Sequence, residues 1–309
     1  MKKIFIDGSY GTTGLRIHER LQERSDIECI SIPFEQRHDD ALRREAMNNA
    51  DIVFLCLPDA AAKEAVNMIE NDQTVVIDTS TAHRTIWTYG LPELEGQRDK
   101  IRNAKRIANP GCHASGFIAL VQPLVKSGLI QKDARLTCFS LTGYSGGGKK
   151  MIAEYESSER SILLDAPRQY GLTQEHKHLK EMVYISGLEK APAFCPIVAD
   201  YYSGMQTVVT LFKENLNGTM EDIKSLYQQI YNNGMIHYCD HDEAMLAGNA
   251  WSGRDDMEIT VRGNEDRILL ISGFDNLGKG ASGAAIQNMN IILGCDETTG
   301  LAGGNYGMD

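Results

Sequence analysis

The sequence predicts an α/β protein in which a Rossmann-like, doubly wound parallel sheet is joined to an α+β domain. In the first third of the chain, short and wholly apolar runs alternate with amphipathic helical patterns, as expected where strands are buried on both faces of a parallel sheet. After residue 135 the strand-like runs are longer, and fewer helical patterns separate them. The length of 309 residues suits two such domains.

The first domain opens with a β-rich run over 2–7, which leads into glycines and then into a helical pattern from Leu15. The same alternation of strand and helix patterns continues, and it predicts strands over 27–32, 52–57 and 75–78 with helices over 39–49 and 60–70. Because the alternation ends near the turn at 109–112, we place this domain at 1–112.

The second domain is placed at 113–280 and begins with an apolar helical segment that contains Phe117 and Leu120. Its predicted strands cover residues 136–142, 184–186, 208–212, 257–262 and 268–273. A helix over 282–293 precedes a glycine-rich stretch over 300–307. We expect the segment 281–309 to complete the first domain.

The charge balance excludes several classes of partner. Lys and Arg total 31 against 42 Asp and Glu, so a net charge of −11 disfavours contact with nucleic acid. The N-terminal apolar run is too short for a signal-peptide core, and no apolar stretch approaches the ~18 residues of a membrane span. We therefore expect a cytoplasmic protein with neither a nucleic-acid nor a membrane partner.

The cysteine pattern favours reduced thiols. The seven cysteines are odd in number and form no CxxC pair, which argues against a disulfide framework and against a thiolate zinc site. The pair His176 and His178 is an improbable metal site, because it lacks further ligands and the chain has no HExxH motif. The sequence therefore predicts no metal.

Three glycines mark a candidate nucleotide-binding turn between the first strand and the first helix. Without side chains the backbone approaches a pyrophosphate closely, and the helix N-terminus supplies partial positive charge. The spacing is GxxGxxG rather than GxGxxG, so an ordinary tight turn remains the alternative. The predicted cofactor contacts in this turn are Gly8, Ser9, Tyr10, Gly11, Thr12, Thr13 and Gly14.

The residues after the second strand favour NADP over NAD. NAD-specific proteins carry an acid there for the ribose hydroxyls, whereas this strand ends without one. Arg37 and His38 follow instead and suit a 2′-phosphate. Glu35 keeps the NAD alternative open, because its carboxylate stands only two residues away.

The segment Asn109-Pro110-Gly111-Cys112 carries the candidate nucleophile. Cys112 stands at the first turn of an apolar helix, whose positive end favours a thiolate near neutral pH. A buried core cysteine has no need of the preceding Pro–Gly turn. We expect His113 to point elsewhere, because adjacent helical residues do not share a face.

A His-Lys-His segment supplies a candidate acid–base group. In an extended chain His176 and His178 face opposite ways, so we expect only one of them to reach the thiol. Two exposed histidines at a helix start are the alternative interpretation of the segment when it is considered alone.

Taken together, these motifs resemble the N-acetyl-gamma-glutamyl-phosphate reductase family in its shorter form. The family is related to the aspartate-semialdehyde and glyceraldehyde-phosphate dehydrogenases. The resemblance runs from Lys3 to Leu301, and five separated motifs in the right order make it specific. The motifs begin at Tyr89 (YGLPE), Asn109 (NPGC), His176 (HKH), Gly204 (GMQT) and Asp275 (DNLGKGASG).

The resemblance implies an NADPH-dependent step of arginine biosynthesis. N-acetyl-gamma-glutamyl phosphate would form a thioester on Cys112, and reduction would give N-acetylglutamate 5-semialdehyde and phosphate, with a proton from His178. The implied partner is thus a small acyl phosphate, and the family tends to form homodimers or tetramers. We assign further cofactor contacts to Pro58 and Asn276, and substrate contacts to Asn109, Arg84, Lys149, His176 and Lys177.

The chain departs from the more common family pattern at three places. DTSTAHR stands at 78–84 where DxSADFR is usual, SGGGK at 145–149 replaces SGAGR, and HKH replaces HRH. A lysine keeps the charge of an arginine but loses the fork that grips an oxyanion.

Two other functions remain as alternatives to the reductase, a Cys–His hydrolase and a non-catalytic nucleotide sensor. A related N-acylated compound is the alternative substrate.

Overall fold

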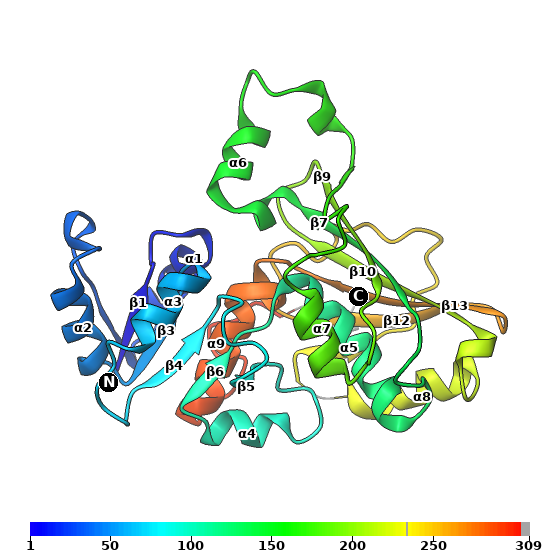
Figure 1. Ribbon diagram of the computed structural model, residues 1–309, viewed down its shortest axis with the longest axis horizontal. Coiled ribbons are helices and arrows are strands. Elements are labelled where there is room, and N and C mark those ends of the chain that lie inside the picture. The colour runs from blue at the N-terminus through cyan, green and yellow to red at the C-terminus, as the bar shows by residue number, and fades with distance from the viewer. Residues whose placement is uncertain (233, 304–309) are drawn as a thin grey trace. The chain divides into compact units, whose positions relative to one another are not determined.

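The computed structural model describes residues 1–232 and 234–303, which form two compact units (Figure 1). The first unit comprises Met1–Pro92, Gly96–Pro110 and Ala281–Leu301, and the second comprises Glu93–Glu95, Gly111–Gly280 and the chain from Ala302. The expected boundary at 112 thus stands about two residues beyond the observed division. The end of the predicted segment 281–309 differs too, because Ala302 exchanges hydrogen bonds with Asp255 of the second unit. Residues 304–309 lie outside the described residues.

The first unit contains a six-stranded parallel sheet in the order β2-β1-β3-β4-β6-β5. This confirms the doubly wound parallel sheet, although the two short strands β5 and β6 were not predicted. The strands are β1 (Lys2–Asp7), β2 (Ile27–Ile30), β3 (Ile52–Leu55), β4 (Val75–Asp78), β5 (Thr88–Tyr89) and β6 (Arg106–Ala108). The helices are α1 (Thr12–Gln22), α2 (Asp40–Asn49), α3 (Asp59–Val66), α4 (Gln97–Asn103) and α9 (Gly283–Leu293).

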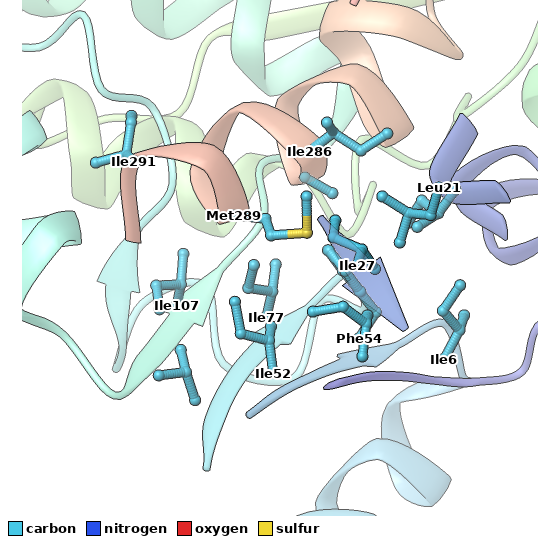
Figure 2. Close-up of a cluster of buried hydrophobic side chains, with 14 of the residues drawn as sticks. Ile6, Leu21, Ile27, Ile52, Phe54, Ile77, Ile107, Ile286, Met289 and Ile291 are labelled. Carbon is cyan, nitrogen blue, oxygen red and sulfur yellow. The ribbon is translucent and has the colours of Figure 1, made fainter. Parts of the chain in front are cut away.

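Both faces of this sheet are covered, which explains the apolar runs in its strands. Successive side chains of a strand point to opposite faces. Ile4 therefore packs in a cluster with residues of α1 and α9, as Figure 2 shows for the neighbouring Leu21 and Ile286. Phe5 packs in a second cluster that includes Met47 of α2.

The second unit is built on a seven-stranded mixed sheet in the order β11-β12-β13-β10-β7-β9-β8. Two of its pairs, β7 with β9 and β11 with β12, are parallel and the others are antiparallel. Its strands are β7 (Thr137–Gly143), β8 (Arg168–Gln169), β9 (Ala193–Ala199), β10 (Met205–Phe212), β11 (Ile236–Tyr238), β12 (Met257–Gly263) and β13 (Arg267–Phe274). The helices are α5 (Cys112–Ser127), α6 (Gly148–Glu156), α7 (Leu179–Ser186) and α8 (Met220–Ile230).

One expectation for the second unit is wrong, and its strands β8, β9 and β11 were not predicted. The predicted strand at 184–186 is the last turn of α7, whose Leu179 and Met182 are buried at helical spacing against α5. Strand β9 was not predicted, because Pro196 interrupts its apolar pattern. Within the described residues, no helix combines the length and apolar character that a membrane span requires.

Helix α5 is the buried centre of this unit and fixes the position of its own first residue. It packs on β10 and β13, and a Cβ at Gly116 would lie 2.6 Å from the Ser272 hydroxyl and 2.7 Å from that of Thr207. Glycine at this position therefore lets the helix lie close to the sheet. Because α5 is held so tightly, its first residue, Cys112, has a fixed place in the unit.

Candidate active site

The glycine-rich turn of the first unit has the tight backbone that its sequence predicts. Gly8 adopts a positive φ of +88°, and a Cβ there would lie 2.4 Å from the Cys56 carbonyl oxygen. A Cβ at Gly14 would lie 2.3 Å from the Gly8 carbonyl oxygen. Gly11 is the N-cap of α1, and no side chain caps the N–H groups that begin the helix. These N–H groups suit an anion.

Beside this turn lies a cavity of about 530 Å³, large enough for part of a dinucleotide. The predicted contacts Gly8, Ser9, Tyr10, Arg37 and Pro58 line it, whereas Gly11, Thr12, Thr13 and Gly14 form the cap and first turn of α1. His18 and His38 also lie in its wall.

The cavity wall has a basic side. The Arg37 guanidinium lies 3.8 Å from the centre of the Phe34 ring and donates a hydrogen bond of 2.7 Å to the Phe34 carbonyl oxygen. Arg43, which sequence reasoning missed, pairs at 2.8 Å with Asp7, the acid that ends β1. Glu35 is not among the described residues that line the cavity.

Cys112 begins α5, as its sequence predicts. Gly111 is the N-cap, and no side chain caps the helix. The thiol is half-buried. A Cβ at Gly280 would lie 2.9 Å from the Cys112 Cβ, so glycine there leaves the room that the cysteine occupies. The half-buried position at a helix N-terminus suits a thiolate nucleophile.

Helix α7 brings a carboxylate and a histidine to the same end of α5. The buried Glu181 accepts a hydrogen bond of 3.2 Å from the backbone N–H of Gly111, which precedes Cys112. His178 is the N-cap of α7 and is also buried. Glu181 was missed at the level of sequence, although its spacing of three from His178 puts both on one side of a helix.

The two predicted histidines lie side by side, and the premise of an extended segment is wrong. His178 has helical dihedral angles, and its backbone N–H donates to Nδ1 of His176 at 3.2 Å. The ring centres are 4.7 Å apart. A turn ahead of α7, rather than an extended chain, therefore points both rings into one cluster.

His113 belongs to this cluster, contrary to the expectation that it points elsewhere. Its ring centre lies 5.7 Å from that of His176 and 5.6 Å from that of His178. Its Nδ1 is 2.7 Å from the Ser140 hydroxyl, and its Nε2 is 2.6 Å from the hydroxyl of Tyr170. Burial, with a smaller effect from the charge of His176, lowers the pKa of His113 to about 3. The ring is therefore neutral near pH 7.

Tyr170 links the histidine cluster to the thiol. Burial raises the pKa of Tyr170 well above its usual value, and the negative charge of a Cys112 thiolate raises it further. The hydroxyl is therefore protonated at neutral pH, and it lies 2.6 Å from Nε2 of His113. No sequence motif singled out Tyr170.

The predicted substrate contacts fall into two groups. Arg84 and Asn109 belong to the first unit. Arg84 Nε donates a hydrogen bond of 3.0 Å to the Asn109 carbonyl oxygen, and the Asn109 side-chain amide donates one of 3.0 Å to the Ala281 carbonyl oxygen. Both are buried and hold the turn that leads to Cys112. Lys149 and Lys177 belong to the second unit and are exposed.

Asn276, predicted as a cofactor contact, belongs to the second unit. Its amide nitrogen donates 3.0 Å to the Ser145 hydroxyl, and its oxygen accepts 2.9 Å from the N–H of Gly204. The side chain is buried and joins three of the family-like motifs, those at 145–149, 204–207 and 275–283.

Two family models match the chain. The semialdehyde dehydrogenase dimerisation domain matches residues 112–276, and the NAD binding domain of semialdehyde dehydrogenases matches residues 20–104. The first model alone covers more than half of the chain.

Curated relatives and solved structures agree with these matches. N-acetyl-gamma-glutamyl-phosphate reductase 2 of Nostoc sp. is 42% identical over 97% of this chain and 99% of its own length. The N-acetyl-gamma-glutamyl-phosphate reductase of Rhizobium meliloti is 42% identical over 94% of this chain and 98% of its own length.

Among solved structures, aspartate semialdehyde dehydrogenase from Francisella tularensis superposes with a TM-score of 0.70 at 18% identity over 95% of this chain and 100% of its own. The aspartate semialdehyde dehydrogenase from Candida albicans with NADP superposes with a TM-score of 0.66 at 16% sequence identity, over 95% of this chain and 98% of its own. At these identities the likeness is one of fold.

Proposed function

The chain belongs to the N-acetyl-gamma-glutamyl-phosphate reductases of the semialdehyde dehydrogenase family, and we propose that it reduces N-acetyl-gamma-glutamyl phosphate to N-acetylglutamate 5-semialdehyde and phosphate. The observation that carries the proposal is Cys112 at the uncapped N-terminus of α5, with histidines, Tyr170 and Glu181 gathered in the same unit. This set supplies a nucleophile, proton donors and a carboxylate that orients the turn.

Cys112 carries the acyl group. Its thiolate attacks the acyl carbon, a carbon–sulfur bond forms, and the carbon–oxygen bond to phosphate breaks with release of inorganic phosphate. A thiolate suits both halves of the reaction, because it is a strong nucleophile and later a good leaving group. Glu181 fixes Gly111, and so holds the first turn of α5 in the orientation that the attack needs.

His178 handles the proton. Reduction turns the carbonyl oxygen of the thioester into the hydroxyl of a thiohemiacetal, and His178 donates the proton to that oxygen. It accepts the proton again when the carbon–sulfur bond breaks and the aldehyde forms. A histidine suits this exchange because its ordinary pKa lies near neutrality. His176 orients His178 through the bond to its backbone N–H.

The first unit fits a nicotinamide dinucleotide, and we assign it NADP. The uncapped start of α1 suits a pyrophosphate, and Arg37, His38 and Arg43 give the cavity a basic side for a 2′-phosphate. Asp7 is the one acid among the described residues of the cavity wall, and its charge is offset by Arg43. NADPH, when bound, supplies the hydride.

Exposed lysines are assigned to the substrate phosphate. Lys149 stands at the first turn of α6, and Lys177 stands between the two histidines. Arg84 and Asn109 position the turn before Cys112. The match to a dimerisation domain supports a homo-oligomer.

The test is a steady-state absorbance assay with purified protein. NADPH consumption should require the acyl phosphate, and in reverse the semialdehyde should reduce NADP only when phosphate is present. Cys112→Ser should lose turnover and keep NADPH affinity, whereas Cys195→Ser, at another half-buried thiol of the same unit, should keep both. Residual activity of Cys112→Ser above a few per cent would contradict the proposal.

A further inference from the structure

A long irregular connection in the second unit lies outside the site described above. Residues 239–256 join β11 to β12 without forming a helix or a strand. Connections longer than about 12–15 residues without secondary structure are uncommon in compact domains.

Three side chains of metal-binding type meet at the two ends of the connection. Cys239 follows β11 directly, His241 stands two residues further on, and Glu258 lies on β12. One ligand atom from each, the Cys239 sulfur, an imidazole nitrogen and a carboxylate oxygen, lies within 4.8 Å of the other two. Cys239 is anchored by its own backbone, because its N–H donates 2.9 Å to the carbonyl oxygen of Ile259.

The histidine is oriented as a metal ligand would be. His241 Nε2 lies 3.1 Å from Oε2 of Glu258, and its Nδ1 lies 3.2 Å from Oε2 of Glu243. Metal-bound histidines commonly donate their other ring N–H to a carboxylate, which fixes the ring and its tautomer. Glu243 has the place of that carboxylate, and Nε2, which now pairs with Oε2 of Glu258, would be the nitrogen that binds the ion.

Glu258 is held rigidly in the same position. The Trp251 indole N–H donates 2.8 Å to its Oε2, and Arg254 pairs at 2.7 Å with Oε1, the oxygen on the other side of the carboxylate. The Arg254 charge is itself offset by Asp256 at 2.8 Å. Glu243 and Glu258 stand beside Cys239 and His241. The cluster therefore keeps an excess of negative charge, which favours a cation.

We propose that Cys239, His241 and Glu258 bind one Zn²⁺ ion, with water as the fourth ligand. A set of one sulfur, one nitrogen and one oxygen ligand suits Zn²⁺ rather than Mg²⁺ or Ca²⁺, which prefer oxygen alone. Tetrahedral zinc with bonds of about 2.0–2.3 Å needs ligand atoms roughly 3.2–3.8 Å apart, which the cluster reaches with small side-chain shifts.

The ion would cross-link the connection to the sheet. It ties both ends of the 239–256 connection to β12, and closing a long loop stabilises the folded chain. Trp251 packs over Gly273 of β13, and the N–H of Gly253 donates 2.7 Å to Asp275, so the connection reaches the motif at 275–283. The expectation of no metal relied on CxxC and HExxH spacings, and a Cys-x-His pair completed by Glu258 escapes both patterns.

The test uses the full chain, first dialysed against a chelator and then titrated with Co²⁺ as a spectroscopic substitute for Zn²⁺. A thiolate-to-cobalt charge-transfer band reports sulfur ligation directly. We expect one Co²⁺ per chain, displacement by Zn²⁺, loss of the band in Cys239→Ser, and at least about tenfold weaker binding in His241→Asn. The matched control is Cys195→Ser, which should keep the band.

The catalytic thiol provides the decisive second control. Cys112 is directly followed by His113 and is the other thiol on which a cobalt ion could bind, so Cys112→Ser should keep the band if the ion binds at Cys239. A band lost in Cys112→Ser, or kept in Cys239→Ser, would overturn the proposal. No band in the wild-type chain would also overturn it, and His241 would then be a simple bridge between two carboxylates. Far-ultraviolet circular dichroism of Cys239→Ser checks that the variant is folded.

Discussion

The rings of His176 and His178 lie nearly perpendicular, at 86°, with their centres 4.7 Å apart. Because the backbone N–H of His178 donates to Nδ1 of His176, that nitrogen carries no proton and is already occupied. His178 is the buried member of the pair, at the N-terminus of α7 and against α5. The two histidines therefore have different tasks.

His178→Asn should lower kcat by roughly 10²–10⁴-fold, which is the usual contribution of general acid–base catalysis. It should also flatten one limb of the pH–rate profile. His176→Asn should be milder, because an asparagine oxygen still accepts the backbone N–H. The measurement is a pH–rate profile of each variant with the semialdehyde as substrate. A normal bell curve in His178→Asn beside a lost limb in His176→Asn would reverse the assignment.

Arg37→Glu should weaken NADPH binding by tenfold or more and leave NADH binding nearly unchanged. The Phe34 ring and carbonyl oxygen hold the guanidinium in the cavity wall, and a carboxylate there would repel a 2′-phosphate. Arg44→Glu is the matched control, because Arg44 makes an exposed pair with Glu70 and carries the same change of charge. Titrations of intrinsic fluorescence give both affinities, and an equal loss for the two cofactors would show that Arg37 does not contact the phosphate.

Two glycines of the nucleotide turn should respond differently to alanine. Gly14→Ala should cost about 2 kcal/mol of unfolding free energy or more, because its Cβ meets the Gly8 carbonyl oxygen at 2.3 Å and backbone yields little. Gly11→Ala has 3.4 Å of room and a negative φ of −77°, so it should fold normally yet bind NADPH more weakly. Chemical denaturation and cofactor titration separate the effects, and equal stability of the two variants would contradict this account of the turn.

His113 should make the second unit acid-sensitive. Its pKa is about 3 in the folded protein and near 6.5 in an unfolded chain. Between these values the unfolded chain binds a proton that the native state does not, so His113 lowers the unfolding free energy by ~1.4 kcal/mol for each pH unit below about 6.5. His113→Gln should therefore show a shallower slope of unfolding free energy against pH than wild type between pH 4 and 6.5. An unchanged slope in His113→Gln would contradict the prediction.

The elements that sequence patterns predicted well are those whose burial is periodic. The parallel strands β1, β3 and β4 are apolar on both faces, and α1 begins where the glycines end. The errors arose where tertiary packing decides. A short apolar run at 184–186 is helical because it continues a buried stripe against α5, and β9 contains a proline.

The same distinction holds for the site. Cys112 was predictable because a Pro–Gly turn before an apolar helix is a local signal, and the structure has it as the first residue of α5. His113 and Tyr170 were not, because their meeting depends on β7 and β8 lying near α5, which no spacing in the chain reveals. The histidine pair was found, but its geometry was wrong, since the turn before α7 is set by packing.

The central claim is that Cys112 carries the acyl group, and the direct measurement is a single-turnover experiment without NADPH. Enzyme mixed rapidly with N-acetyl-gamma-glutamyl phosphate should release one phosphate per site in a burst, and mass spectrometry of the quenched digest should find the acyl group on the Cys112 peptide. No burst, or an acyl group on another residue, would contradict the account.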